Sequence, residues 1–127
     1  MNVYLSTSSA DLALAQNMMK AIQNHGHTVA LDWTATFQKP ESRWGDLVGQ
    51  EILAVQGAEV VLLVGEPTPG CYVEVGAALA SGVPVVWLRG RSTQDTKHFF
   101  FYSPLVLVVR GIFSEALQVL NWMEGTK

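Results

Sequence analysis

Short apolar runs rich in β-branched residues alternate along this chain with segments that have the apolar spacing of helices. Five strands are expected, over residues 3–6, 28–32, 58–64, 83–88 and 105–109. Four helices are expected, over residues 8–25, 44–56, 71–81 and 112–123. Strands that alternate with helices predict right-handed crossover connections and a parallel sheet with helices on both faces.

The run from Ala58 to Val64 is almost wholly apolar, which is typical of a strand buried on both faces of a sheet. We therefore expect one α/β domain over residues 1–127, a flavodoxin-like or Rossmann-like three-layer sandwich. Its five-stranded parallel sheet is expected to have the strand order 2-1-3-4-5. The loops after Ser6, Val64 and Leu88 should then surround one crevice at the carboxyl ends of the strands.

Composition excludes several classes of partner. The 127 residues are 49% hydrophobic and only 15% charged, with a net charge of −3. Because no basic cluster is present, we expect neither a nucleic-acid polymer nor a membrane as partner. The longest apolar runs are too short to span a bilayer and the opening residues lack a signal-peptide pattern, so a cytoplasmic location is expected.

The scarcity of charge also favours self-association, as a homodimer or a larger homo-oligomer. The aromatic run Phe99–Tyr102 is expected in a loop, as an interface or lid element, because four exposed aromatic residues in a row favour aggregation of a monomer. A single cysteine, Cys71, excludes an intrachain disulfide and a zinc site built from cysteines. No metal or organic cofactor is expected.

Glu74 is the residue most informative about function. Its neighbours from Gly70 to Ala78 are otherwise small or apolar, and they directly follow the loop after the third strand. The dipole at a helix N-terminus favours an ionised carboxylate. Such a carboxylate in a crevice can act as a nucleophile or stabilise a developing cation. On the local pattern alone, a glutamate that faces solvent in a first helical turn is an equal alternative.

Other polar and aromatic residues near the expected crevice each have two interpretations. Ser8 and Ser9 either cap the first helix or donate hydrogen bonds to an anion. Trp33, with Phe37 and Trp44 nearby, either forms a wall against which a base stacks or anchors a polar loop. Tyr4 is either a core residue of the first strand or a residue of the site. Glu51 either faces solvent from its helix or faces the crevice.

Three segments resemble the nucleoside 2-deoxyribosyltransferase superfamily, which includes the 2'-deoxynucleoside 5'-phosphate N-hydrolases. They are the run Ala58–Val64, the turn Pro67-Thr68-Pro69-Gly70 and the segment Glu74–Val85. Val3-Tyr4-Leu5 is similar to the first strand of that family. The resemblance extends to about Leu88. It implies an enzyme that cleaves or transfers the N-glycosidic bond of a nucleoside or a nucleoside 5'-monophosphate.

The resemblance also implies roles for individual residues. Glu74 matches the glutamate that attacks the anomeric carbon, and Tyr4 matches the tyrosine that positions it. Glu51 falls where the family has an aspartate, one methylene shorter, and is the candidate proton donor to the base. Thr68 falls where the hydrolases have a phosphate-contacting serine and the transferases an aspartate, which favours the phosphate-accepting branch.

His98 lies in the region through which a neighbouring subunit contributes to the site in that family. The serine-rich loop from Ser6 to Ser9 replaces a loop that is richer in glycine there. The residues expected to bind substrate are Ser6, Ser8, Ser9, Trp33, Thr68, Gly70 and His98.

Two other functions fit the same pattern. The opening from Tyr4 to Asp11, together with a glutamate on the helix after the third strand, also resembles Toll/interleukin-receptor-like domains. Those domains hydrolyse NAD or act as signalling modules. A catalytically silent nucleotide-binding sensor is the third possibility, since one fold serves many functions.

Overall fold

The structure, a computed structural model, describes residues 1–90 and 99–126. Its centre is a five-stranded parallel sheet with the order β2-β1-β3-β4-β5. The strands are β1 (Asn2–Ser6), β2 (Thr28–Val29), β3 (Val60–Val64), β4 (Val85–Arg89) and β5 (Val106–Arg110). The α/β, flavodoxin-like fold and its predicted strand order are confirmed.

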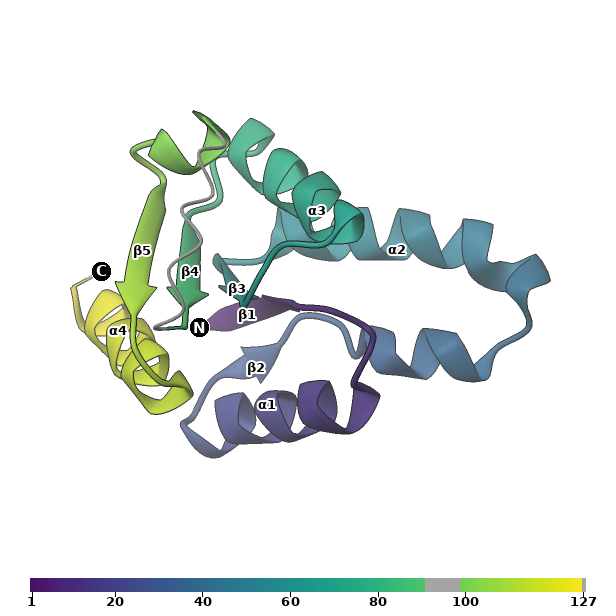
Figure 1. Cartoon of the computed structure of the whole chain (residues 1–127), viewed down its shortest axis with the longest axis horizontal. Helices are drawn as coiled ribbons and strands as arrows, with labels where there is room; N and C mark the ends of the chain where they lie inside the picture. Colours follow the sequence, from purple (N-terminus) through teal and green to yellow (C-terminus); the bar gives the residue numbers. More distant parts are fainter. Residues whose placement is uncertain (91–98, 127) are drawn as a thin grey trace.

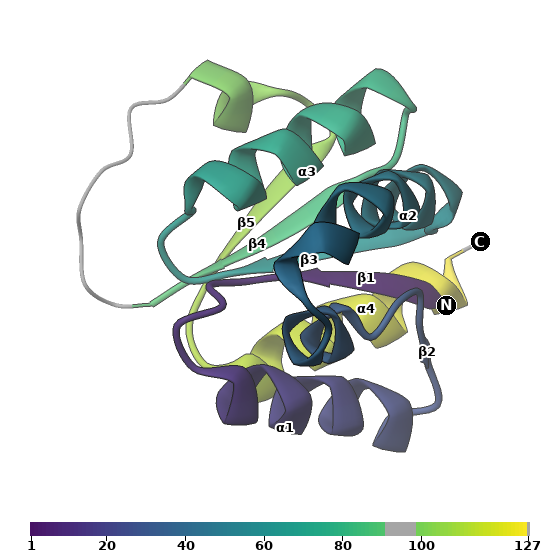
Figure 2. The same cartoon turned by 90° about the vertical axis from the view of Figure 1, so that its right-hand side faces the viewer.

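Helices cover both faces of the sheet, as predicted. Figures 1 and 2 show α1 (Leu12–Asn24) and α4 (Phe113–Gly125) on one side, with α2 (Trp44–Gly57) and α3 (Pro69–Ala80) on the other. The middle strands are therefore closed to solvent on both faces, and Val60, Val61, Leu62 and Leu63 of β3 have no exposed surface. Among the described residues, no helix is both long and apolar enough to cross a membrane.

The first helix begins later than the sequence predicts. Asp11, and not Ser8 or Ser9, is its N-cap, because an Asp11 carboxylate oxygen accepts a hydrogen bond from the Leu14 amide at 3.0 Å. Ser8 instead accepts a hydrogen bond from the amide of Ala10 at 3.1 Å, within the turn before the helix. The loop after β1 is therefore longer than predicted.

The segment after β2 contains more regular structure than the expected loop. Strand β2 has two residues and not five, because Asp32 caps a 3₁₀ helix over Trp33–Gln38 by accepting a hydrogen bond from the Thr34 amide. A second 3₁₀ turn, Glu41–Arg43, leads into α2.

The aromatic run Phe99–Tyr102 forms a 3₁₀ helix and not a loop. Phe101 is buried and stacks on Trp87 of β4, with ring centroids 4.2 Å apart. The run is therefore not a fully exposed loop, because Phe101 belongs to the core, and its role as an interface or lid element stays a prediction. Tyr102 is exposed, as expected.

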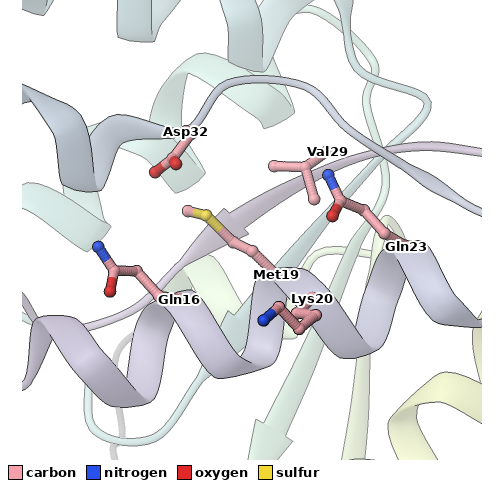
Figure 3. Close-up of a pocket in the computed structure, with 6 residues that line it drawn as sticks. All are labelled: Gln16, Met19, Lys20, Gln23, Val29 and Asp32. Atoms are coloured by element: carbon pink, nitrogen blue, oxygen red, sulfur yellow. The ribbon is translucent and has the colours of Figure 1, made fainter.

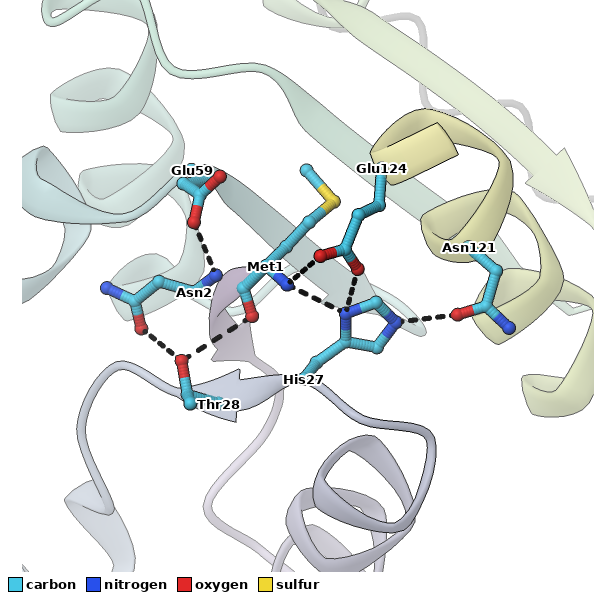
Figure 4. A network of polar contacts seen from close by, with 7 residues as sticks. All are labelled: Met1, Asn2, His27, Thr28, Glu59, Asn121 and Glu124. Atoms are coloured by element: carbon cyan, nitrogen blue, oxygen red, sulfur yellow. Dashed lines mark hydrogen bonds and ion pairs between the residues drawn. The ribbon is translucent and has the colours of Figure 1, made fainter. Parts of the chain in front are cut away.

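A polar cluster joins the beginning of β1 to α4 (Figure 4). The buried His27 places Nε2 at 2.8 Å from Oδ1 of Asn121 and Nδ1 at 3.2 Å from a carboxylate oxygen of Glu124. The other carboxylate oxygen of Glu124 lies 3.2 Å from the Met1 amino nitrogen. These contacts hold the last helix against the edge of the sheet that carries β1 and β2.

Candidate active site

A small cavity of about 120 Å³ lies where the loops that follow β1 and β3 meet the first residues of α3. The strand order reverses between the neighbouring strands β1 and β3, which is where the sequence predicts a crevice. The cavity therefore lies at the predicted crevice. The described lining comes from the loop after β1, the 3₁₀ segment, α2 and the start of α3, and consists of Thr7, Ser9, Trp33, Phe37, Glu51, Thr68, Gly70, Cys71 and Glu74. The loop predicted after the fourth strand lies partly outside the described residues, over 91–98.

Glu74 lies in the second turn of α3, with its side chain partly buried at the cavity. Its Oε1 accepts a hydrogen bond of 2.9 Å from the hydroxyl of Ser6, the last residue of β1. Ser6 is completely buried and does not line the cavity. The structure therefore places Ser6 as a residue that orients Glu74, and not where the sequence predicts it, against a substrate.

Tyr4 lies two residues before Ser6, so both side chains point to the same face of β1. The Tyr4 hydroxyl is buried, and no atom of the described residues completes a hydrogen bond of regular geometry with it. Burial, and then the nearby charge of Glu74, raise the pKa of Tyr4 well above its ordinary value. The hydroxyl therefore remains protonated and can only stabilise Glu74 as a donor.

The surroundings of Glu74 oppose its ionisation. Burial raises the pKa of Glu74 to about 7, although the hydroxyls of Tyr4 and Ser6 pull it down. The charge of Glu51 adds a smaller increase. Near neutral pH the carboxyl is therefore present in both protonation states, which places it among the perturbed groups that mark functional sites.

Glu51 reaches the same cavity from the middle of α2. Its side chain is partly buried, and this burial raises its pKa as well. An exclusively solvent-facing position for Glu51, one of the two sequence interpretations, is therefore wrong. The cavity brings together two carboxyl groups from two helices, both of which hold a proton more tightly than an exposed glutamate does.

Aromatic rings form one wall of the cavity. Trp33 is buried, and its indole Nε1 donates a hydrogen bond of 2.7 Å to the carbonyl of Leu5. Phe37 packs edge-to-face on Trp33, with centroids 6.2 Å apart, and on Trp44 at 5.7 Å. Trp33 therefore anchors its segment and also lines the cavity, and its stacking against a base stays a prediction.

The first turn of α3 also lines the cavity. Thr68 is the N-cap of α3, and its hydroxyl oxygen accepts a hydrogen bond of 3.4 Å from the Cys71 amide. The same hydroxyl lies 3.2 Å from Sγ of Cys71, which is buried. Gly70 also lines the cavity. Thr68 and Gly70 therefore place a hydroxyl and a stretch of helix-start backbone at the cavity.

The two serines of the loop after β1 differ in their relation to the cavity. Ser9 lines it, whereas Ser8 does not. His98 lies outside the described residues. Thr7, Phe37 and Cys71 line the cavity without having been selected as site residues from the sequence. Thr7 donates a hydrogen bond of 3.1 Å to the Val64 carbonyl, a contact between the ends of two strands that no local motif predicts.

The charged side chains in the described lining, Glu51 and Glu74, are both acids. In the described residues, no group of three or more His, Cys, Asp or Glu side chains is placed to hold a metal ion. The chemistry that this lining supports is thus nucleophilic attack and proton transfer by carboxyl groups, next to an aromatic surface.

A larger hollow of about 290 Å³ lies between α1 and the end of β2 (Figure 3). Its lining consists of Gln16, Met19, Lys20, Gln23, Val29 and Asp32. None of these residues is a predicted site residue. Among the described residues that line the hollow, Asp32 is the carboxylate, and it caps the 3₁₀ helix. This described lining therefore lacks a pair of acids such as Glu51 and Glu74.

Comparison with known proteins gives a likeness among solved structures. No family model and no curated protein sequence matches the chain. Among solved structures, the CMP N-glycosidase BcmB of Clostridium botulinum is similar, with a TM-score of 0.65 and 15% sequence identity. The match covers 95% of this chain and 99% of BcmB. At 15% sequence identity this likeness establishes the fold. The shared fold agrees with the resemblance of the sequence to the nucleoside 2-deoxyribosyltransferase superfamily.

Proposed function

We propose that this protein cleaves the N-glycosidic bond of a nucleoside or a nucleoside 5'-monophosphate, with Glu74 as the nucleophile. The observation that carries the proposal is the setting of Glu74. It is held by Ser6, lies beside Tyr4 and faces a second carboxyl group in a cavity at the switch point of the sheet. The likeness to a CMP N-glycosidase supports the same choice of bond.

The proposed reaction has two steps. In the first, an oxygen of ionised Glu74 attacks the anomeric carbon as the bond to the base nitrogen breaks, and Glu51 gives its proton to the departing base. In the second, water attacks the glycosyl ester, Glu51 takes a proton from that water, and Glu74 leaves as a carboxylate. If a second base replaces water, the same intermediate leads to transfer.

The lining favours a planar base and a small sugar. A cavity of about 120 Å³ is smaller than the usual 300–1,000 Å³ of a small-molecule site, so it fits part of a nucleotide. The wall of Trp33 and Phe37 offers an aromatic surface to a base. Thr68 and the start of α3 offer donors to a 5'-phosphate, because amide groups at a helix N-terminus attract anions.

The test is release of free base, measured by chromatography, from a panel of nucleosides, their 5'-monophosphates and NAD. We expect base release from a nucleoside or a monophosphate, and a loss of at least about a thousandfold in Glu74→Gln. Gln118→Glu, a change on the exposed surface of α4, serves as a control that should retain activity. Adding a second free base to the reaction distinguishes transfer from hydrolysis.

Each other outcome replaces the proposal with a specific alternative. Base release from NAD alone favours the Toll/interleukin-receptor-like NAD hydrolase. Binding of a nucleotide, detected by calorimetry, without release of any base favours the sensor. Full activity of Glu74→Gln contradicts the proposed nucleophile whatever the substrate.

A further inference from the structure

The hollow between α1 and the segment after β2 has nearly the size of a small-molecule site. Its volume of about 290 Å³ is close to the lower end of the 300–1,000 Å³ that such sites usually have. Its described lining shares no residue with the cavity at Glu74. Figure 3 shows that Gln16 and Gln23 rise from α1 on either side of Met19, toward the segment that carries Asp32.

The charged groups of the hollow have bonding capacity that the fold does not use. Asp32 accepts hydrogen bonds from the amide and the hydroxyl of Thr34, and both end at Oδ1. The other carboxylate oxygen, Oδ2, is therefore available to a ligand. Lys20 is exposed on α1, and among the described residues no ion pair joins it to Asp32. A cationic donor and an anionic acceptor thus line one space.

The rest of the lining matches the shape and the edge of a nucleobase. Met19 is buried and Val29 is half-buried, so they offer an apolar surface to the face of a ring, and contacts of sulfur with aromatic rings are favourable. Lysine donates to the carbonyl oxygen of a base, aspartate accepts from an amino group, and glutamine pairs with an edge that has both. Lys20 and Asp32 together therefore select a base that has a carbonyl oxygen and an exocyclic amino group.

We propose that this hollow is a second ligand site, which binds a free base with both groups, such as cytosine or guanine. Lys20 donates to the carbonyl oxygen, and Oδ2 of Asp32 accepts from the amino group. The amide of Gln23 pairs with a remaining polar group of the ring. A free base is a product of the proposed reaction, so a regulatory role of this site rests on the proposed function, whereas base binding itself does not.

One short helix connects the hollow to the cavity at Glu74. Asp32 caps the 3₁₀ helix that follows β2, and Nε2 of Gln16 donates a hydrogen bond of 3.3 Å to Oγ1 of Thr34 in that helix. Its residues Trp33 and Phe37 line the cavity at Glu74. A base that binds Asp32 therefore contacts the residue that holds this aromatic wall in place, and we expect the two sites to be coupled.

Methyl NMR on the full chain with cytosine, in the absence of any nucleoside, tests the site directly. We expect the Met19 methyl resonance to shift, because the ring current of a bound base acts on nearby groups, with a Kd of about 1 mM or below. The Met123 methyl on α4 is the internal control and should not shift. Uracil, in which a carbonyl replaces the amino group, should bind at least about tenfold more weakly.

Asp32→Asn tests the assignment of the amino group. Asparagine caps a helix as well as aspartate does, but it presents an amide group in place of the second carboxylate oxygen. The preference should therefore reverse from cytosine to uracil. Lys20→Met, on the helix surface, should weaken both bases and serves if Asp32→Asn does not fold, which thermal unfolding checks. Glu41→Gln removes an exposed carboxylate outside the hollow and should leave both affinities unchanged.

A Met19 resonance that cytosine does not shift at about 10 mM overturns the proposal. So does equal binding of cytosine and uracil, or a shift that both variants retain. Coupling is measured at the Trp33 indole N–H resonance, which should shift with the Kd found at Met19. A different Kd there, or no shift, overturns the coupling. These measurements use neither a substrate nor Glu74, so their outcome is separate from that of the base-release assay.

Discussion

At the scale of single residues, Glu74 occupies a position in which its ionised form costs stability. Burial holds its pKa near 7, so its charged form is disfavoured in the folded chain relative to the unfolded chain. The sequence predicted this residue because a lone acid in a small-residue helix is conspicuous. The role of Ser6 could not be predicted, because it depends on a contact between residues 68 positions apart.

The pKa of Glu74 predicts a pH-dependent gain of stability in Glu74→Gln. A raised folded-state pKa means that the folded chain binds a proton more tightly, so wild-type stability falls as pH rises from about 4.5 through about 7. We expect Glu74→Gln to equal wild type near pH 4.5 and to exceed it by about 2–3 kcal/mol at pH 8. Urea unfolding at both pH values measures this, and a difference that does not vary with pH would contradict the burial of this carboxyl.

The two carboxyl groups together predict a bell-shaped pH profile. The proposed reaction needs ionised Glu74 and protonated Glu51. The two carboxyl groups then share a single proton, which lies on Glu51 and not on Glu74. Activity, measured as kcat/KM for base release, should therefore fall above about pH 7 and also at acidic pH where both groups are protonated. Glu51→Gln should have lower activity that rises through pH 7 to a plateau. A plateau in wild type would show that no proton from Glu51 is needed.

Thr68→Asp tests whether the site binds the phosphate of a nucleoside 5'-monophosphate beside Thr68. Aspartate caps a helix as well as threonine does, so the thermal stability should be retained. The added negative charge should raise KM for a 5'-monophosphate by at least about tenfold and change KM for the nucleoside much less. Thr68→Ser is the matched control and should resemble wild type. Equal effects on both substrates would place the phosphate away from α3.

At the scale of elements, the turn between β3 and α3 sets the position of Glu74. Gly65 follows β3 with a positive φ of 82°, its amide donates to the Leu88 carbonyl, and its carbonyl accepts from the Trp87 indole at 2.9 Å. The turn residues predicted a break here, but not these contacts with β4. The 3₁₀ helix that carries Phe101 was missed for the same reason, since stacking on Trp87 decides its position.

Gly65→Ala tests this turn against a matched glycine. A side chain at Gly65 would meet open space, so only the positive φ opposes the substitution. Gly65→Ala should therefore lower the free energy of unfolding by about 1–2 kcal/mol. Gly76→Ala in α3 also meets open space but lies in a helix, where alanine should stabilise by about 0.5–1 kcal/mol. Opposite shifts of Tm are the expected result. Shifts of the same sign would show that the turn is not held at this φ.

At the scale of the whole molecule, the alternation of strands and helices was sufficient to predict the layers, the strand order and the end of the sheet that carries the cavity. These features follow from local patterning and from general rules of connection. The exposure of β5 was not predicted, because an outer strand and a middle strand of similar composition have the same sequence pattern. Low charge indicates self-association, which stays a prediction.

In the proposed reaction, Glu74 forms a covalent bond to the anomeric carbon. The most direct measurement is the intact mass of the protein after reaction with a 2'-fluoro analogue of the nucleoside or monophosphate that releases base, because fluorine at C2' slows hydrolysis of the ester. We predict a mass increase of one glycosyl group per chain, mapped by peptide sequencing to Glu74 and absent from Glu74→Gln. Base release without an adduct, or an adduct on another residue, would contradict the account.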